Sequence, residues 1–268
     1  MTRLPGRLVL LGHPVSHSLS PKFQNAALRC AALPLTYEPL DVEPWQLDAT
    51  MSSLVAGGAA GNVTIPHKAR VAARCARLTP LAARVGAVNT FWVENGALVG
   101  DNTDVGGFRH ALTSLAPDLD RSRSVALLGA GGAAAAVLAA LEDEGVSEVR
   151  VYARSRERAQ PLRDRFARAV LVPDGAEAVR GAALVVNATP IGLDGYAQPI
   201  DVGLLASDAA VLDLVFSPSE TPFVHAARAR GLRASDGLEM LLAQGALAFE
   251  RWFGIPPDRD AMRDAVAR

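Results

Sequence analysis

Two short polar segments of the sequence carry residue types that can move a proton. The first, Asn62-Val63-Thr64-Ile65-Pro66-His67-Lys68, passes from an apolar strand pattern into a helical one. Lys68 falls in or near the first turn of that helix, where the helix dipole opposes a cation. Such a lysine is either tolerated in solvent or held there for chemistry, since desolvation favours its neutral, proton-accepting form. Spacing alone favours the solvated lysine.

The second segment, Asp101-Asn102-Thr103-Asp104-Val105-Gly106-Gly107, opens another predicted helix. Asp104 has the position and residue type of a helix N-cap, and without further evidence the cap is the preferred interpretation. In the first segment, Asn62 and Thr64 lie two residues apart, so their side chains share one face of an extended chain. The residue types therefore permit acid–base chemistry, but their spacing does not require it.

Serines and histidines occupy the remaining polar loops. Ser18 and Ser20 share a face if their loop is extended, and Ser20, directly before a proline, is predicted to be the N-cap of a helix. No His–Cys or His–Glu spacing indicates a metal site. We therefore expect no bound metal, and solvated or locally hydrogen-bonded side chains for His13, His17 and His67.

Near the middle of the chain, a glycine-rich stretch predicts a nucleotide-binding turn. Val125–Leu128 reads as a short buried strand, glycines follow at 129, 131 and 132, and an alanine-rich stretch to Leu141 strongly favours helix. In such a turn the glycines let the backbone approach a pyrophosphate, and free N–H groups of the first helical turn point at it. A glycine turn needed only for tight strand–helix packing looks much the same, so the context has to decide.

The end of the next predicted strand indicates which dinucleotide binds. An acid about 20 residues beyond the glycine turn holds the ribose 2′-OH of NAD, whereas an Arg there accommodates the 2′-phosphate of NADP. Here the sequence runs Ala153-Arg154-Ser155-Arg156-Glu157-Arg158, with no acid at the strand end. Guanidinium groups bind phosphate bidentately and stay charged. The alternatives are a solvated Arg-rich face and a nucleic-acid patch, which lacks an aromatic stacking platform; the position favours NADP.

Composition limits the possible partners. Lys plus Arg (27) nearly balances Asp plus Glu (28), so no overall field attracts nucleic acid or an anionic membrane. Apolar runs stop well short of the ~20 residues of a membrane span, and no cleavable leader pattern is recognised. Cys30 and Cys75 stand in helical patterns without a CxxC spacing, so we expect buried or half-buried thiols and no disulfide. These features predict a soluble cytoplasmic protein.

Strand and helix patterns alternate along the chain in two series. The first includes a predicted helix from Pro66 to about Leu78, and a β-hairpin whose strands, from Gly86 to Val93 and from Ala97, flank an Asn-Gly turn. The glycine-rich stretch opens the second series, in which Pro161 argues against one unbroken helix. The predicted fold class is α/β with two domains and a cleft between them. Residues 1–104 plus 237–268 form a substrate-binding domain with a mainly parallel sheet, and residues 105–236 form a Rossmann dinucleotide-binding domain.

Taken in order, these segments resemble the shikimate dehydrogenase family over essentially the whole chain. Each motif alone is weak evidence, whereas the ordered set is highly specific. The motifs are His17-Ser18-Leu19-Ser20-Pro21, Asn62 to Lys68, Gly86-Ala87-Val88-Asn89-Thr90, Asp101-Asn102-Thr103-Asp104, Gly129 to Ala134, Asn187-Ala188-Thr189, Thr221-Pro222-Phe223, and Asp236-Gly237-Leu238-Glu239-Met240-Leu241 with Gln244.

The resemblance implies the reversible NADPH-dependent reduction of 3-dehydroshikimate to shikimate, a step of aromatic amino-acid biosynthesis. It implies that Lys68 and Asp104 are the catalytic pair, which replaces both plain interpretations given above, with Asn62 supporting them. The expected partner is the small-molecule substrate, with no nucleic acid and no membrane. Family members are monomers or dimers, so a monomer or a homodimer is expected.

The resemblance also implies how substrate and cofactor are held. Ser18 and Ser20 would bind the substrate carboxylate. The ring hydroxyls would be bound by Thr64, Asn89, Asp104 and Gln244. The NADP contacts would come from Gly129, Ala130, Gly131, Gly132, Ala133, Arg154, Ser155, Arg158, Ala188, Thr189 and Gly237.

Two positions depart from the family pattern. Ala153 stands where the family usually has Asn, before Arg154-Ser155, and Phe216 replaces the Tyr of Asp-Leu-Val-Tyr. These changes keep a quinate/shikimate or aminoshikimate dehydrogenase with relaxed NAD/NADP use as an alternative. A catalytically silent nucleotide-binding regulator is a further alternative, although Lys68 and Asp104 are both intact.

Overall fold

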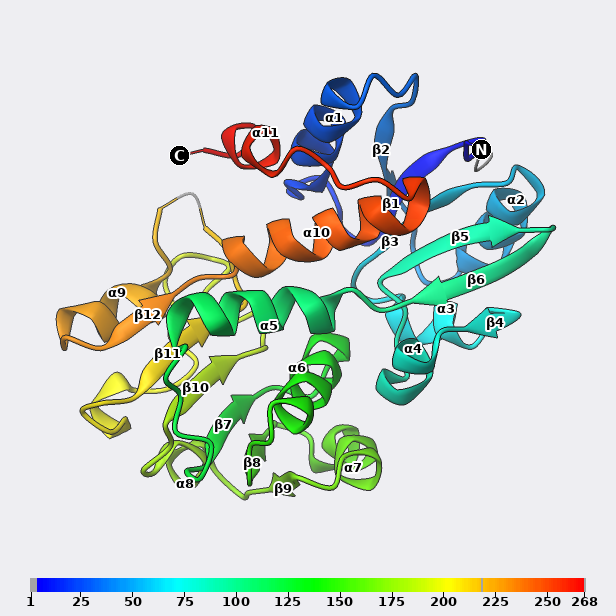
Figure 1. Cartoon of the computed structure of the whole chain (residues 1–268). Helices are drawn as coiled ribbons and strands as arrows, with labels where there is room; N and C mark the ends of the chain where they lie inside the picture. Colours follow the sequence, from blue (N-terminus) through cyan, green and yellow to red (C-terminus); the bar gives the residue numbers. More distant parts are fainter. Residues whose placement is uncertain (1–3, 218, 268) are drawn as a thin grey trace. The chain divides into compact units, whose positions relative to one another are not determined.

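The computed structural model describes residues 4–217 and 219–267. It contains two compact units, which are described separately (Figure 1). Unit 1 comprises the residues up to Gly107 together with Leu241–Ala267, and unit 2 comprises Phe108–Met240. The chain passes from one to the other within α5 (Asp104–Leu115) and near the start of α10 (Leu238–Phe253). Unit 2 is therefore an insertion in the sequence of unit 1.

A six-stranded sheet forms the centre of unit 1, in the order β2-β1-β3-β5-β6-β4. β1 pairs in parallel with β2 and β3, and β4 with β6, whereas β5 is antiparallel to β3 and β6. The sheet is thus parallel-rich with one hairpin, as predicted. Its strands are β1 (Leu8–Gly12), β2 (Tyr37–Asp41), β3 (Ala60–Val63), β4 (Arg77–Leu78), β5 (Thr90–Glu94) and β6 (Ala97–Asp101). The helices are α1 (Ser20–Cys30), α2 (Leu47–Ala56), α3 (Lys68–Ala72), α4 (Pro80–Val85) and α11 (Arg259–Asp264).

One core of unit 1 lies between this sheet and α2. Val9 and Leu11 of β1 pack with Met51 and Leu54 of α2 and with Phe91 of β5. Every residue of β1 is buried, which is typical of a strand covered on both faces. Burying one such side chain contributes ~1.5–3 kcal/mol. This core therefore fixes the strands whose ends carry the polar segments.

The hairpin of β5 and β6 closes at the predicted Asn-Gly turn. Asn95 and Gly96 have φ angles of 52° and 77°, the left-handed values that a type I′ turn requires at both central residues. The turn sets the register that pairs Thr90 with Asp101. Asn89 and Asn102, the residues just outside this pair, therefore lie together at the opposite end of the hairpin.

Unit 2 is built on a wholly parallel sheet in the order β12-β11-β10-β7-β8-β9 (Figure 1). Read from β9, this is the order of the Rossmann fold, which confirms the predicted class. The strands are β7 (Val125–Leu128), β8 (Val149–Tyr152), β9 (Ala169–Leu171), β10 (Leu184–Asn187), β11 (Ala210–Asp213) and β12 (Arg233–Ser235). The helices are α6 (Gly132–Asp143), α7 (Arg156–Arg165), α8 (Gly175–Val179), α9 (Pro222–Ala229) and the 3-10 turn η1 (Val202–Leu204).

Two predictions about unit 1 were wrong in their local structure. The helix expected from Pro66 to Leu78 is only α3, because Arg77 and Leu78 leave it to pair with β6. The strand expected from Gly86 begins at Thr90, because Gly86 still serves as the C-cap of α4 and Val88 donates its backbone N–H to the Lys68 carbonyl instead of to a strand. The side chain of Thr79 caps α4, and Gly86, at φ 71°, ends it in the left-handed conformation.

Two predictions about helix ends and breaks were also wrong. Ser20 is the first residue of α1, and Leu19 is the N-cap, without a side-chain cap bond. α7 runs unbroken through Pro161. The backbone bond that Pro161 removes would have used a carbonyl near the start of the helix, and the helix continues past that single loss.

The remaining expectations concern thiols, metals and membranes. Cys30 is exposed, contrary to prediction, and Cys75 is half-buried; both are free. Burial raises the pKa of the Cys75 thiol to about 11. The described residues contain no cluster of His, Cys, Asp and Glu able to hold a metal. Within the same residues, no helix has the length and apolar character needed to cross a bilayer.

Candidate active site

The polar segments of unit 1 gather at one edge of its sheet. The segments after β1 and β3 leave neighbouring parallel strands at their carboxyl ends, and the backbone N–H of His13 donates to the carbonyl of Ile65 at 2.9 Å. Because β5 runs antiparallel to β3, its first residue, Thr90, lies opposite Asn62 at this edge. Asp101, the last residue of β6, pairs with Thr90 and lies at the same edge. The sheet topology thus brings four sequence motifs together: the segments after β1, β3 and β6 and the segment before β5.

Lys68 and Asp104 form an ion pair at this edge, with 2.6 Å between Nζ and Oδ2. Their side chains are only 16% and 6% exposed. Each residue is the first of its helix, α3 and α5 respectively. The solvated lysine and the plain N-cap suggested by spacing alone are therefore both wrong, because each charge has the other as its partner.

Asn89 fixes the second oxygen of this carboxylate. Its Nδ2 donates to Asp104 Oδ1 at 2.8 Å and also lies 2.9 Å from Thr103 Oγ1 and 3.2 Å from Gln244 Oε1. Its Oδ1 accepts from the backbone N–H of Thr103 at 2.7 Å. Since both Asp104 oxygens are bound, the carboxylate has little freedom to rotate. The structure thus unites Lys68, Asp104, Asn89 and Gln244 in one network.

Tyr37 and Asn62 support this network from behind. The fully buried Tyr37 hydroxyl donates to Asn62 Oδ1 at 2.8 Å, and Asn62 Nδ2 donates to the carbonyl of Asn89 at 3.1 Å. Burial raises the pKa of Tyr37 well above its usual value. Sequence reasoning missed Tyr37, which belongs to no motif and reaches the site only through sheet pairing.

A buried carboxylate was missed as well. Asp101 accepts from Thr79 Oγ1 at 2.5 Å and from the backbone N–H of Asn102 at 2.8 Å, and Arg251 of α10 binds its other oxygen at 2.8 Å. These bonds hold the turn that leads into Asp104. The position of Asp101 in the Asp101–Asp104 motif could have indicated its role in the site. Arg251 lies in no motif, so nothing in the local sequence indicated that it binds Asp101.

The remaining substrate candidates lie in the segments after β1 and β3. Ser18 Oγ accepts from the backbone N–H of Ser20 at 3.2 Å, which shapes the start of α1. Ser20 is buried and Thr64 is half-buried. A side chain at Gly12 would collide with the Thr64 methyl group, so the strand end and the Thr64 segment are in close contact.

Of the three histidines near this edge, His17 is exposed, and the other two make hydrogen bonds. His13 Nδ1 lies 2.6 Å from Asp41. His67, expected in a polar loop, is completely buried, with its Nε2 2.6 Å from the carbonyl of Val42. This contact fixes His67, the residue directly before Lys68, in the protein interior rather than in solvent.

In unit 2, the glycine turn has the form that a dinucleotide requires. Gly129 has φ 118°, and a Cβ there would come within 2.8 Å of the Ala188 carbonyl oxygen, so only glycine fits. A Cβ at Gly131 would instead meet open space. Gly131 is also the N-cap of α6, and no side chain caps that helix end. Free N–H groups and open space at one helix start fit a pyrophosphate.

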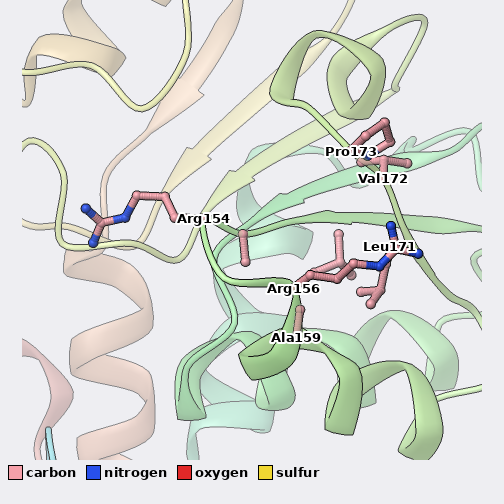
Figure 2. Close-up of a pocket in the computed structure, with 8 residues that line it drawn as sticks. Arg154, Arg156, Ala159, Leu171, Val172 and Pro173 are labelled. Carbon is pink, nitrogen blue, oxygen red and sulfur yellow. The ribbon is translucent and has the colours of Figure 1, made fainter.

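A pocket of about 240 Å³ lies at the end of β8. Arg154 and Arg156 both line it, and Figure 2 shows their side chains extending in opposite directions from the chain. Ser155 is the N-cap of α7, and Arg158 donates its backbone N–H to the Ser155 hydroxyl. Arg156, which was not predicted to contact the cofactor, therefore lines the pocket, whereas Arg158, which was, does not.

The fold and these two sites define a class: an oxidoreductase with a Rossmann unit for a phosphorylated nicotinamide dinucleotide, which also holds a buried Lys68–Asp104 ion pair. Three family models match the chain: a shikimate dehydrogenase substrate-binding domain at residues 10–91, a shikimate/quinate 5-dehydrogenase at 112–191, and a shikimate 5′-dehydrogenase C-terminal domain at 237–267. The chain belongs to the shikimate dehydrogenase family.

Individual relatives match over nearly the full length. A shikimate dehydrogenase (NADP(+)) of Mesorhizobium japonicum is 42% identical, covering 96% of this chain and 94% of the relative. The crystal structure of a Thermus thermophilus shikimate 5-dehydrogenase in complex with NADP(H) and shikimate is 39% identical, with a TM-score of 0.87 and 98% of each chain covered. The shikimate dehydrogenase of Aquifex aeolicus has a TM-score of 0.91 at 34% identity, again over 98% of each chain.

Proposed function

We propose that this chain catalyses the reversible NADPH-dependent reduction of 3-dehydroshikimate to shikimate. The observation that carries the proposal is the buried Lys68–Asp104 pair, 2.6 Å apart and held by Asn89. A silent relative would have no need of two opposite charges kept in register inside a protein, where desolvation makes them costly. The family membership supports the same activity.

Substrate binding and cofactor binding are assigned to different parts of the chain. We assign substrate binding and proton transfer to residues 1–104 with 237–268, and NADP binding to residues 105–236. The Lys–Asp network in unit 1 and the glycine turn in unit 2 support this division. In unit 1, Ser18 and Ser20 would hold the substrate carboxylate. Ring hydroxyls would be bound by Thr64, Asn89, Asp104 and Gln244.

The residues of unit 2 fit NADP. The uncapped start of α6, formed by Gly131, Gly132 and Ala133, offers N–H groups to the pyrophosphate, and Gly129 and Ala130 shape the turn before it. Arg156, which extends towards Leu171 and Val172, offers its guanidinium group to a 2′-phosphate in the pocket after β8. Arg154 extends the other way and would reach the same phosphate by a change of rotamer, with Ser155 and Arg158 shaping the segment. Ala188, Thr189 and Gly237 complete the proposed contacts. When bound, the reduced nicotinamide supplies a hydride to the ring ketone.

Proton transfer is the task of unit 1. As the ketone oxygen gains negative charge, the Lys68 ammonium stabilises it and donates a proton from Nζ. The Asp104 carboxylate orients the hydroxyl and pairs with Lys68 through Oδ2. Asn89 holds Asp104 Oδ1, so Oδ2 stays directed at Lys68. In the reverse direction the same pair accepts the proton from shikimate.

One set of initial rates tests the proposal. Shikimate and quinate are each oxidised with NADP⁺ and with NAD⁺, and the reduced cofactor is followed by its absorbance. We expect kcat/KM for shikimate with NADP⁺ to exceed every other pair by at least about tenfold, because pocket hydrogen bonds and the arginines both discriminate. A preference for quinate or NAD⁺ would support the relaxed dehydrogenase instead. The absence of turnover with all four pairs would remove the enzyme function.

The proposal also covers the cellular compartment and the oligomeric state of the enzyme. Two free cysteines suit a reducing compartment, and we place the enzyme in the cytoplasm. We propose a monomer or a homodimer with shikimate and NADP as its ligands. Light scattering at two protein concentrations distinguishes the two oligomeric states.

A further inference from the structure

The carboxyl edge of the unit 2 sheet carries a buried acid that the proposed chemistry does not use. Asp213 ends β11 and lies opposite Asn187, the last residue of β10, in the parallel register. Both side chains are completely buried. We propose that Asp213 is a positioning residue for NADP, acting through Asn187 on the Ala188-Thr189 segment. This inference rests on the proposed NADP-linked function.

Three donors hold the Asp213 carboxylate. Its Oδ1 accepts from Asn187 Nδ2 at 2.8 Å and from the backbone N–H of Val215 at 3.0 Å. Its Oδ2 accepts from the Thr221 hydroxyl at 2.8 Å. Hydrogen bonds to an ionised carboxylate are stronger than those between neutral groups. The Asn187 amide is therefore fixed with its nitrogen towards Asp213, which leaves its oxygen for other donors.

Asn187 transmits this constraint to the proposed cofactor segment. Its Oδ1 accepts from the backbone N–H and the hydroxyl of Thr189, at 3.0 and 2.6 Å. The same hydroxyl accepts from the backbone N–H of Ile191 at 3.2 Å. The carbonyl oxygen of Ala188, inside this bonded segment, is the atom that a Cβ at Gly129 would meet. The carboxylate thus fixes the backbone that lies against the glycine turn.

The turn after Asp213 also contacts Gly237. The backbone N–H of Gly237 donates to the Val215 carbonyl at 3.0 Å. A side chain at position 237 would collide with the carbonyl of Leu214. The glycine turn, the Ala188-Thr189 segment and Gly237 therefore all adjoin backbone that bonds to Asp213 directly or through Asn187.

Asp213 is a buried acid whose bonded partners in the described residues include no cation. Burial raises the pKa of the Asp213 carboxyl, and the nearby Asp236 raises it further. Among the charged groups of the described residues, Asp236 is the one that acts on it, and it is itself an acid. A buried charge without a cation partner is costly, and such perturbed groups concentrate at functional sites.

The test compares Asp213→Ala with Asp213→Asn in the full-length chain. The Kd for NADP⁺ and the Kd for shikimate are measured by titration calorimetry, together with Tm. We expect Asp213→Ala to weaken NADP⁺ binding about tenfold, which corresponds to about 1.4 kcal/mol. Asp213→Asn should recover most of this loss, because its amide oxygen can accept the same bonds from Asn187 and Val215. The shikimate Kd should not change.

Two further variants separate positioning from general stability. Asp201→Ala is the matched control, since its carboxylate accepts from the Gly203 N–H at 2.8 Å and bonds to none of the proposed cofactor residues. It should leave the NADP⁺ Kd unchanged. Asn187→Ala should also weaken NADP⁺ binding about tenfold, and combining it with Asp213→Ala should add little, because both act through Thr189. If Asp213→Ala does not fold, Asn187→Ala carries the same test.

Two results would overturn the inference. The first is a wild-type NADP⁺ Kd in Asp213→Ala or in Asn187→Ala. The second is additive losses in the double variant, which would show that the two residues act separately. If the wild-type chain binds shikimate but not NADP⁺, the NADP-linked function fails, and this inference fails with it.

Discussion

The two sites differ in what they are made of. In unit 1 the groups proposed to transfer the proton are side chains that already bind one another: Lys68 binds Asp104, and Asp104 binds Asn89. In unit 2 the proposed pyrophosphate site is backbone, with a glycine at 131 where a side chain would meet open space. One site is filled by its own polar groups, and the other is left open.

The difference follows from the two tasks. Proton transfer needs a fixed acid–base pair, and a buried charge is stable only if its partner is fixed as well. Binding a large dinucleotide needs space, backbone N–H donors and flexible, positively charged side chains at the surface. Substitutions in the Lys68–Asp104 pair should therefore act mainly on turnover, whereas substitutions in the glycine turn and the arginines of unit 2 should act mainly on cofactor affinity.

The largest expected effect is that of Lys68→Ala. Turnover should fall about 10³-fold, within the range usual for loss of a general acid, while the shikimate KM changes much less. The Kd for NADP⁺, measured by calorimetry, should stay at the wild-type value. Lys22→Ala, which removes the chain's other lysine, exposed on α1, is the control. Near-normal turnover in Lys68→Ala would end the catalytic role of this residue.

Two glycine substitutions in unit 2 should distinguish the effect of backbone strain from the effect of filling the space proposed for the pyrophosphate. Gly129→Ala forces a side chain into φ 118° and against Ala188, so it should cost ~1–3 kcal/mol of stability and weaken NADP⁺ binding as well. Gly131→Ala meets no protein atom, so its Tm should equal that of the wild type while NADP⁺ binding weakens about tenfold or more. Thermal unfolding with and without NADP⁺ measures both. Wild-type affinity in Gly131→Ala would place the pyrophosphate elsewhere.

The arginines of the pocket after β8 test cofactor choice. Arg154→Ala should raise the KM for NADP⁺ about tenfold and leave the KM for NAD⁺ unchanged, because only NADP⁺ carries the 2′-phosphate. Arg156→Ala should act in the same direction. Arg163→Ala, in the last turn of α7, is the matched control and should change neither value. Equal effects on both cofactors would remove the phosphate role.

The smallest effect is expected at a position where the chain departs from its family. Phe216→Tyr restores a hydroxyl and should lower the KM for shikimate about two- to fivefold, the value of one modest hydrogen bond. Initial rates at saturating NADP⁺ measure it. A KM equal to that of the wild type would mean that this position faces away from the substrate.

The sequence predicts best those parts of the molecule whose signals are local. β7 has the predicted bounds, because a short apolar run between turn residues can be read directly. The Asn-Gly turn forms where its two residues stand, since both tolerate positive φ. The pairing of Lys68 with Asp104 was expected from the family resemblance, whereas their spacing alone favoured two unrelated surface roles.

What the sequence did not predict depends on distant partners. Arg77 and Leu78 continue a helical pattern and become a strand only because β6 offers its free edge. Tyr37 and Arg251 support the site through partners 25 and 150 positions away, Asn62 and Asp101, and no local pattern records such pairs. Ser20 has the type and position of a cap, but the cap bond is absent in the formed helix.

The insertion of unit 2 into the sequence of unit 1 has a consequence for the order of folding during synthesis. Unit 2 is continuous in sequence, so it can fold as soon as its last strand leaves the ribosome. Unit 1 begins first but lacks α10 until unit 2 has been synthesised. Gln244 and Arg251 therefore reach Asn89 and Asp101 last. We expect the nascent chain to acquire its cofactor site before its proton-transfer network is complete.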